Sequence, residues 1–318
     1  MKKMVLSSIL IIVGFVFLIV GADLLVDGAS GMAKKFHIPE IIIGLTIVSI
    51  GTSMPELFVS IASALEGHSD MAIGNIVGSN LSNLLLILGL SAALKPVVFQ
   101  KETKKYEIPM CLFVTAMLMF FCNTGTGISR IEAIILLILF CGFICYTIYM
   151  GKKESNKDVQ EEKEDRGKNK ILKDVILIII GILGLKIGGD LTVNNAVNVA
   201  NYFNISEKII SLTILAIGTS LPELVTSIMA AIKGNSDIAI GNIIGSNIFN
   251  ILLIIGVSAI IAPIMYNITY NYDFIILLIS SIILALFPFI PPKNVMSRAN
   301  GIIYLLMYAT YMVTLFVK

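Results

Sequence analysis

Apolar runs of about 20 residues recur along almost the whole chain, and they constrain its fold more than any other feature. A helix of that length crosses the ~30 Å hydrocarbon core of a bilayer. Of the 318 residues, 57% are hydrophobic and 14% are charged, whereas soluble domains carry about 25% charged residues. The sequence therefore predicts an all-α polytopic membrane protein surrounded by the lipid bilayer. The net charge is only +2 and the lysines lie mainly between the apolar runs, so we expect no nucleic-acid partner.

Hydropathy predicts ten transmembrane helices. They are expected at residues 5–27, 38–65, 71–93, 107–122, 129–150, 173–201, 206–232, 238–262, 273–290 and 299–317. No small-residue cleavage site follows the first, so we expect a retained span and not a signal peptide. The segment KKESNKDVQEEKEDRGKNK has mixed charge and no aromatic residue, which predicts a solvated linker. The chain then divides into a five-helix unit at 1–151, a charged linker at 152–172 and a second five-helix unit at 173–318.

The two units contain an internal repeat. A shift of 167 positions aligns residues 44–89 with residues 211–256, and 29 of the 46 aligned pairs are identical. The identities include Gly, Ser, Asn, Pro, Glu and Asp, which hydrophobicity alone would not hold in register. Because each unit has an odd number of spans, the second must enter the membrane from the opposite side. The sequence thus predicts ten helices arranged as two inverted-topology five-helix repeats, an arrangement of secondary transporters that places substrate sites near the midplane.

Lysine and arginine accumulate in cytoplasmic loops of membrane proteins. With the N-terminus outside, the charged linker at 152–172 is cytoplasmic and supplies most of the excess of basic residues on that side. We therefore expect a multi-pass protein of the cell membrane with both termini outside.

A glutamate lies near the middle of the second and seventh expected spans, within GTSMPELFVS and GTSLPELVTS. Ionised Glu56 and Glu223 would each cost several kcal/mol at that depth without a partner or a water-filled cavity. Each follows a proline, which removes one helical hydrogen bond and clashes with the carbonyl four residues back, at Gly51 or Gly218. Each motif therefore offers a carboxylate beside loosened backbone carbonyls, which membrane proteins tolerate where they line a cavity.

Hydroxyl and amide side chains surround both glutamates in the expected helices. Residues three and four before each glutamate share its helix face, and a polar stripe follows in GNIVGSNLSN and GNIIGSNIFN. The hydroxyls are those of Thr52, Ser53, Thr219 and Ser220, and the stripes are Asn75, Ser79, Asn83 and Asn242, Ser246, Asn250. Gly74, Gly78, Gly241 and Gly245 have the small-xxx-small spacing that permits close helix contact.

This ligand inventory contains oxygen only, without His or Cys. Such hard ligands suit calcium or sodium and not zinc, copper or iron, and calcium accepts six to eight irregularly placed oxygens. Two carboxylates also match the charge of one divalent cation. A single buried Glu can be explained by a structural hydrogen bond between helices. Two symmetric copies with the same polar neighbours instead favour an ion site.

Other polar residues in the apolar segments have structural interpretations. Asp23 and Asp190 are equivalent in the repeat, and the i, i+4 spacing of Lys186 and Asp190 suggests an intramembrane ion pair. Asp70 and Asp237 are predicted to be helix N-caps. The two histidines, His37 and His68, are expected in loops. Cys111, Cys122, Cys141 and Cys145 have no metal-type spacing and are interpreted as packing residues.

The repeated GTSxPE and GNxxGSNxxN motifs resemble the alpha repeats of the cation/calcium exchanger superfamily, which includes sodium/calcium exchangers. The resemblance extends to both repeats, the number of spans and the position of the linker. It implies alternating access, with ions held between the second, third, seventh and eighth helices. Glu56 and Glu223 would be shared calcium and sodium ligands, with further oxygens from Thr52, Ser53, Ser79, Thr219, Ser220 and Ser246 and from the backbone carbonyls of Ser49 and Ala216.

One departure from the family pattern concerns the counter-ion. Many sodium/calcium exchangers have an aspartate at the last position of the second motif, whereas this chain has Asn83 and Asn250 at the two equivalent positions. The site then holds two carboxylates, so calcium binding is retained while sodium or proton coupling stays open.

The sequence therefore predicts a secondary calcium/cation antiporter, most simply a Na⁺/Ca²⁺ exchanger that works as a monomer and extrudes calcium. A H⁺/Ca²⁺ antiporter on the same fold is the nearest alternative, and a cation channel is a more distant one. We expect no enzymatic activity and no cofactor, because no nucleophile–base pair or cofactor motif is present.

Overall fold

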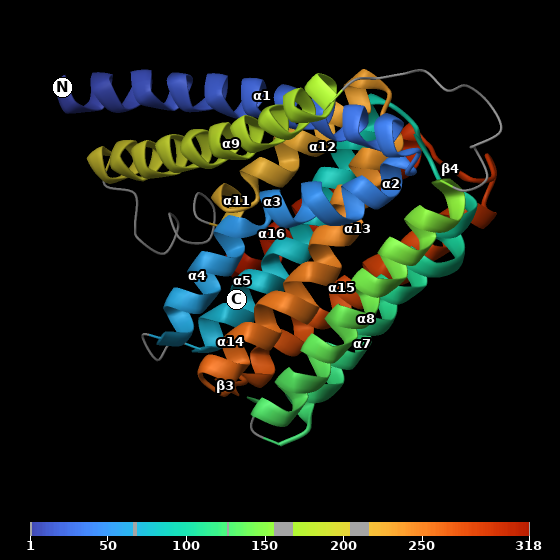
Figure 1. The fold of residues 1–318 in the computed structure, drawn as a ribbon. Coiled ribbons are helices and arrows are strands. Elements are labelled where there is room, and N and C mark those ends of the chain that lie inside the picture. The colour runs from blue at the N-terminus through green and yellow to red at the C-terminus, as the bar shows by residue number, and fades with distance from the viewer. Residues whose placement is uncertain (1, 66–68, 126, 156–167, 204–215, 318) are drawn as a thin grey trace.

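The computed structural model describes residues 2–65, 69–125, 127–155, 168–203 and 216–317. These residues are almost entirely helical, and the helices form one bundle with two short β-ribbons at its ends (Figure 1). His68 lies outside the described residues, as does the first part of the span expected at 206–232.

The elements of the first half follow the expected spans with breaks inside them. In order they are α1 (Lys2–Phe36), α2 (Glu40–Ile43), the π-helical segment η1 (Gly44–Val48), α3 (Ser49–Thr52), α4 (Met54–Leu65), α5 (Ser69–Leu81), the π-helical segment η2 (Ser82–Leu88), α6 (Gly89–Leu94), β1 (Val97–Val98), the π-helical segment η3 (Thr103–Glu107), α7 (Ile108–Asn123), β2 (Gly127–Ile128) and α8 (Arg130–Ser155).

The second half repeats this order where it is described. Its elements are α9 (Lys168–Tyr202), α11 (Ala216–Gly218), α12 (Leu221–Lys233), α13 (Ser236–Phe249), the π-helical segment η6 (Asn250–Ile255), α14 (Gly256–Ile261), β3 (Ile264–Met265), the 3₁₀ turn η7 (Ile268–Tyr270), α15 (Asn271–Leu286), the 3₁₀ turn η8 (Phe287–Phe289), β4 (Val295–Met296) and α16 (Arg298–Val317).

Six helical stretches among the described residues are long and apolar enough to cross a membrane, and the bent segment from Glu40 to Leu65 makes a seventh. The chain is therefore a helical protein with several membrane spans. Of the other expected spans, 173–201 and 299–317 coincide with the long helices α9 and α16.

The centre of the bundle consists of the two helical stretches that carry the asparagine motifs. In the most apolar 18-residue stretch of each span, 78% of the residues are buried for Ala72–Leu94 and 83% for Ser236–Ile261. The corresponding share is 22% for Arg130–Lys153 in α8. The low value for α8 is expected of a helix whose outer face contacts lipid. The polar motifs therefore lie in the most enclosed part of the protein.

Helices α1 and α9 pack against each other along their length and lie together on one side of the bundle (Figure 1). Glycines make this close approach possible, because a Cβ on Gly21 would lie 2.8 Å from the backbone nitrogen of Leu185. A Cβ on Gly188 would lie 2.7 Å from the carbonyl oxygen of Gly14. Small residues let membrane helices approach in this way. The first helices of the two halves thus form one paired unit.

Two antiparallel β-ribbons join loops of the two halves. Strand β1 pairs with β4, and β2 pairs with β3. The 167-residue shift relates β1 to β3 and β2 to β4, so the ribbons are equivalent to each other. They lie at opposite ends of the bundle, where β4 and β3 are labelled in Figure 1.

The α1–α9 contact leads to a stability prediction. Gly188→Val should lower the free energy of unfolding by about 1–3 kcal/mol, because the new side chain would force two packed backbones apart. Gly142→Val in α8 is the matched control, since a Cβ there meets no described atom within 4 Å. Thermal unfolding in detergent measures both variants, and equal stabilities would contradict the packing assigned to Gly188.

Candidate cation-binding site

The second expected span is broken beside its glutamate. Helix α3 ends at Thr52, α4 begins at Met54, and the stretches Glu40–Thr52 and Met54–Leu65 are bent by 48°. Ser53 between them has φ −84° and ψ 7°, and its counterpart Ser220 has φ −90° and ψ 8°. The kink expected from proline is therefore confirmed in α3–α4, and the same backbone turn occurs before α12.

Both glutamates occupy the first turn of the helix that restarts after the break, and both are buried, Glu56 at 0% and Glu223 at 1% exposure. The N-terminus of a helix carries a partial positive charge from unpaired N–H groups, which stabilises nearby anions. Proline is tolerated at the start of a helix because that N–H needs no intrahelical partner. The repeated Ser-x-Pro-Glu order thus creates a helix start and places a carboxylate on it.

The serines at the breaks donate hydrogen bonds to the carboxylate of the opposite half. Ser53 donates to Glu223 Oε1 at 2.8 Å, and Ser220 donates to Glu56 Oε1 at 3.3 Å. Ser79 also donates to Glu56 Oε1, at 2.9 Å. These pairs show that the two motifs, 167 residues apart in sequence, lie together and could form one site.

The serines of the asparagine motifs complete two equivalent clusters. Ser79 Oγ lies 2.7 Å from Ser220 Oγ, and Ser246 Oγ lies 2.9 Å from Ser53 Oγ. All four hydroxyls are at most 3% exposed. The predicted residues Ser53, Ser79, Ser220 and Ser246 are therefore brought together with the two glutamates.

An asparagine layer lies between α5–η2 and α13–η6. Asn80 and Asn247 bond reciprocally to each other's backbone oxygens at 3.3 and 3.4 Å. Asn83 donates to Asn247 Oδ1 and Asn250 to Asn80 Oδ1, each at 2.9 Å. Asn80 and Asn247 were not among the residues expected at the site, although their identity in both GSN motifs was a visible signal. Their amides orient the predicted residues Asn83 and Asn250.

Four oxygens of this site have no hydrogen-bond donor among the described residues. They are Glu56 Oε2, Glu223 Oε2, Asn83 Oδ1 and Asn250 Oδ1, two equivalent pairs. All four are acceptors, and a buried acceptor without a partner costs about 1–3 kcal/mol, more when charged. Since oxygen ligands of this kind coordinate hard cations, the arrangement is chemically suited to hold one.

Threonine and asparagine side chains support the site from behind. Thr52 Oγ1 donates to Asn242 Oδ1 at 3.0 Å, and Asn242 donates to Ser227 at 2.9 Å. In the first half, Asn75 donates to Ser60 at 3.1 Å. The first members of the expected asparagine stripes thus bond between neighbouring helices.

The carbonyl oxygen of Ser49 accepts a hydrogen bond from Ser53 N at 3.0 Å, and it lies 3.4 Å from Thr52 Oγ1 as a longer alternative to the Thr52–Asn242 bond. Its counterpart Ala216 begins α11, and its side chain is outside the described set. Thr219 Oγ1 is buried without a described partner. Thr219 therefore has an oxygen available for a ligand, whereas the Ser49 carbonyl already accepts a hydrogen bond from Ser53 N.

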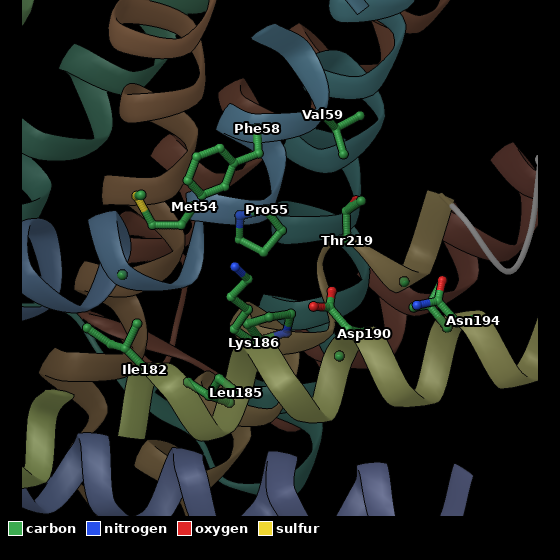
Figure 2. A pocket seen from close by; sticks show the side chains of 15 residues that line it. Met54, Pro55, Phe58, Val59, Ile182, Leu185, Lys186, Asp190, Asn194 and Thr219 are labelled. Carbon is green, nitrogen blue, oxygen red and sulfur yellow. The ribbon is translucent and has the colours of Figure 1, made fainter. Parts of the chain in front are cut away.

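A cavity of about 550 Å³ adjoins both helix breaks (Figure 2). Its lining includes the two prolines, Thr219 and one face of α9, while the glutamate side chains themselves do not line it. Lys186 and Asp190 of α9 project into it. The cavity therefore ends next to covered carboxylates.

Two structural expectations from the sequence are wrong. Lys186 and Asp190 do not form an ion pair in the described structure; the Lys186 ammonium lies 5.6 Å from the centre of the Phe58 ring. Asp237 is not an N-cap, because α13 begins at Ser236, and its carboxylate accepts from Gln100 at 3.2 Å. The side chain of Asp70 lies outside the described residues. In both errors, a residue from another element supplies the contact.

The asparagine layer can be tested independently of transport. Asn80→Leu should destabilise the protein by about 1–3 kcal/mol, because it removes the acceptor of Asn250 and leaves a buried amide unsatisfied. Asn123→Leu is the control, since the Asn123–Asn271 pair is exposed and surface changes stay within about 0.5 kcal/mol. Thermal unfolding is again the measurement, and a loss no larger than that of the control would contradict the role of the layer.

Comparison with known proteins places this geometry in a family. The family described as sodium/calcium exchanger protein matches residues 6–149 and 173–317. The putative antiporter CaxA of Alkalimonas amylolytica is 41% identical over 82% of each chain. The sodium/calcium exchanger MaX1 of Methanosarcina acetivorans is 31% identical over 98% of each chain.

Solved structures of the sodium-calcium exchanger NCX_Mj, one of them soaked with Na⁺ and Ca²⁺, match with a TM-score of 0.85 at 31% identity over 98% of both chains. The fold, the sequence and the resemblance of the repeated motifs therefore agree. The chain belongs to the sodium/calcium exchanger protein family.

Proposed function

We propose that this protein is a calcium/cation antiporter that binds Ca²⁺ between Glu56 and Glu223. The observation that carries the proposal is the set of four donor-free oxygens on Glu56, Glu223, Asn83 and Asn250. They belong to two symmetric groups at the most buried part of the bundle. Two carboxylates balance a divalent charge, and the amide oxygens add neutral ligands of the kind that Ca²⁺ accepts.

The same ligands explain how the counter-ion would couple. Sodium also takes oxygen ligands, so occupation of the carboxylates by sodium would exclude calcium. We assign the further positions to Thr52, Thr219 and the hydroxyls of Ser53, Ser79, Ser220 and Ser246, with the backbone carbonyls of Ser49 and Ala216 at the two ends. Competition for Glu56 and Glu223 then makes calcium exit depend on sodium entry.

The proposed architecture has ten spans in two inverted repeats, 1–151 and 173–318, in the cell membrane. The β-ribbons support it, because equivalent ribbons lie at opposite ends of the bundle, as five spans per half require. With the basic linker 152–172 in the cytoplasm, both termini are outside. The α1–α9 pair, the first and sixth spans, is the element we expect to move over the rest, within a single functional monomer.

The glutamates provide the first functional test. Glu56→Gln and Glu223→Gln should each reduce calcium uptake by proteoliposomes to background, because the site loses one of two balancing charges. Folding should survive, since glutamine keeps the shape and removes a buried charge. Glu102→Gln, in the partly exposed segment before η3, is the control and should transport normally. Near-normal uptake by either site variant would exclude the assignment.

The second test concerns the counter-ion. An outward sodium gradient without a pH gradient should drive calcium uptake into proteoliposomes, as the names of relatives such as MaX1 suggest for this chain. The specific observation that favours the alternative is Asn250, which leaves the site with two carboxylates. Uptake driven only by a pH gradient would overturn sodium coupling and move the protein to H⁺/Ca²⁺ antiport.

A further inference from the structure

The two halves are nearly identical at the ion site but differ in the helix that faces each break. Lys186 on α9 corresponds to Ile19 on α1, and Asn194 corresponds to Asp27. The cavity of about 550 Å³ lies on the α9 side and includes Lys186, Asp190 and Thr219 in its lining. The positive charge of Lys186 therefore has no counterpart on the α1 side, whereas Asp190 corresponds to Asp23.

The α1 side differs in its packing and carries ion pairs at the protein surface. Val26, the equivalent of the cavity-lining Val193, is 0% exposed. Lys233, at the end of α12, lies 2.7 Å from Asp23 and 2.6 Å from Asp27 of α1. Lys233 is thus paired with two carboxylates of α1, whereas Lys186 of α9 faces a cavity.

Lys186 is placed at one helix break and Asp190 at the other. Figure 2 shows the Lys186 side chain directed toward Pro55 and the Asp190 carboxylate on the side of Thr219. The Lys186 ammonium lies over the Phe58 ring, 5.6 Å from its centre. A π face attracts a cation without cancelling its net charge, so the ammonium still acts on ions inside the cavity.

We propose that Lys186 is a specificity-determining residue: its positive charge in the α9 cavity lowers the protein's affinity for divalent cations more than its affinity for monovalent cations. A fixed positive charge repels Ca²⁺ with twice the energy with which it repels Na⁺ at the same place. Lys186 therefore weakens the binding of both cations and weakens calcium binding more than sodium binding. Asp190 acts in the opposite sense. The inference rests on the calcium/cation antiport proposed above.

The size of the effect follows from Coulomb's law. For a bound ion on the order of 8 Å from the Lys186 ammonium in a water-like medium, the lysine charge raises the dissociation constant about 2.5-fold for Na⁺ and about sixfold for Ca²⁺. For a pure charge effect, the fold-change in the calcium dissociation constant equals the square of the fold-change in the sodium dissociation constant. A packing change would alter the two constants without that relation.

The experiment is equilibrium binding of radioactive calcium to purified full-length protein, with sodium competition, at low ionic strength. Lys186→Met should tighten calcium binding about sixfold and sodium binding about 2.5-fold. Lys186→Arg keeps the charge and should resemble the wild type, and Asp190→Asn should weaken calcium binding. Lys101→Met, on the exposed segment before η3, is the control and should change nothing.

Salt supplies a second readout. Choline chloride raised from about 20 mM to 0.5 M should abolish most of the difference between Lys186→Met and wild type, because screening shortens the reach of a charge. Unchanged calcium and sodium constants in Lys186→Met, or equal fold-changes for both ions, would overturn the inference. Failure of the wild-type protein to bind calcium would instead overturn the proposed function.

Discussion

The burial of two carboxylates at membrane depth is the constraint on which the rest of the structure depends. An uncompensated charge there costs several kcal/mol, and the protein stabilises one oxygen of each glutamate with hydrogen-bond donors. Helix N-termini lie beneath Glu56 and Glu223, and serines from the opposite half donate to their Oε1 atoms. The Oε2 atoms have no described donor. The site is thus half compensated by protein, which leaves the other half of each carboxylate for a ligand.

Because each glutamate accepts a hydrogen bond from a serine of the opposite half, neither half of the chain can form this arrangement alone. Ser53 serves Glu223, Ser220 serves Glu56, and the amides of Asn80 and Asn247 bond across the same interface. Strands at both ends of the bundle also pair between halves. The repeat therefore functions as one interlocked unit, and ligand binding would act on both halves together.

Much of the site was predictable because its residues are repeated. The bend at Ser53 follows from proline chemistry, and the duplicated polar set predicts one shared oxygen site. The errors concern Lys186 and Asp237. Spacing of i, i+4 brings two side chains within reach, but whether they pair depends on competitors from other helices. Phe58 and Gln100 are such competitors, and nothing in the local sequence identifies them.

The sequence by itself determined the class of protein, the internal repeat and the chemical type of the site, because hydropathy, residue identity and helix periodicity are local properties. Only the tertiary structure decided which serine meets which glutamate, which oxygens lack a donor, and which of the two equivalent outer helices leaves a cavity. Those outcomes depend on packing between segments that are far apart in the sequence, and the two halves differ there at positions such as Lys186 and Ile19.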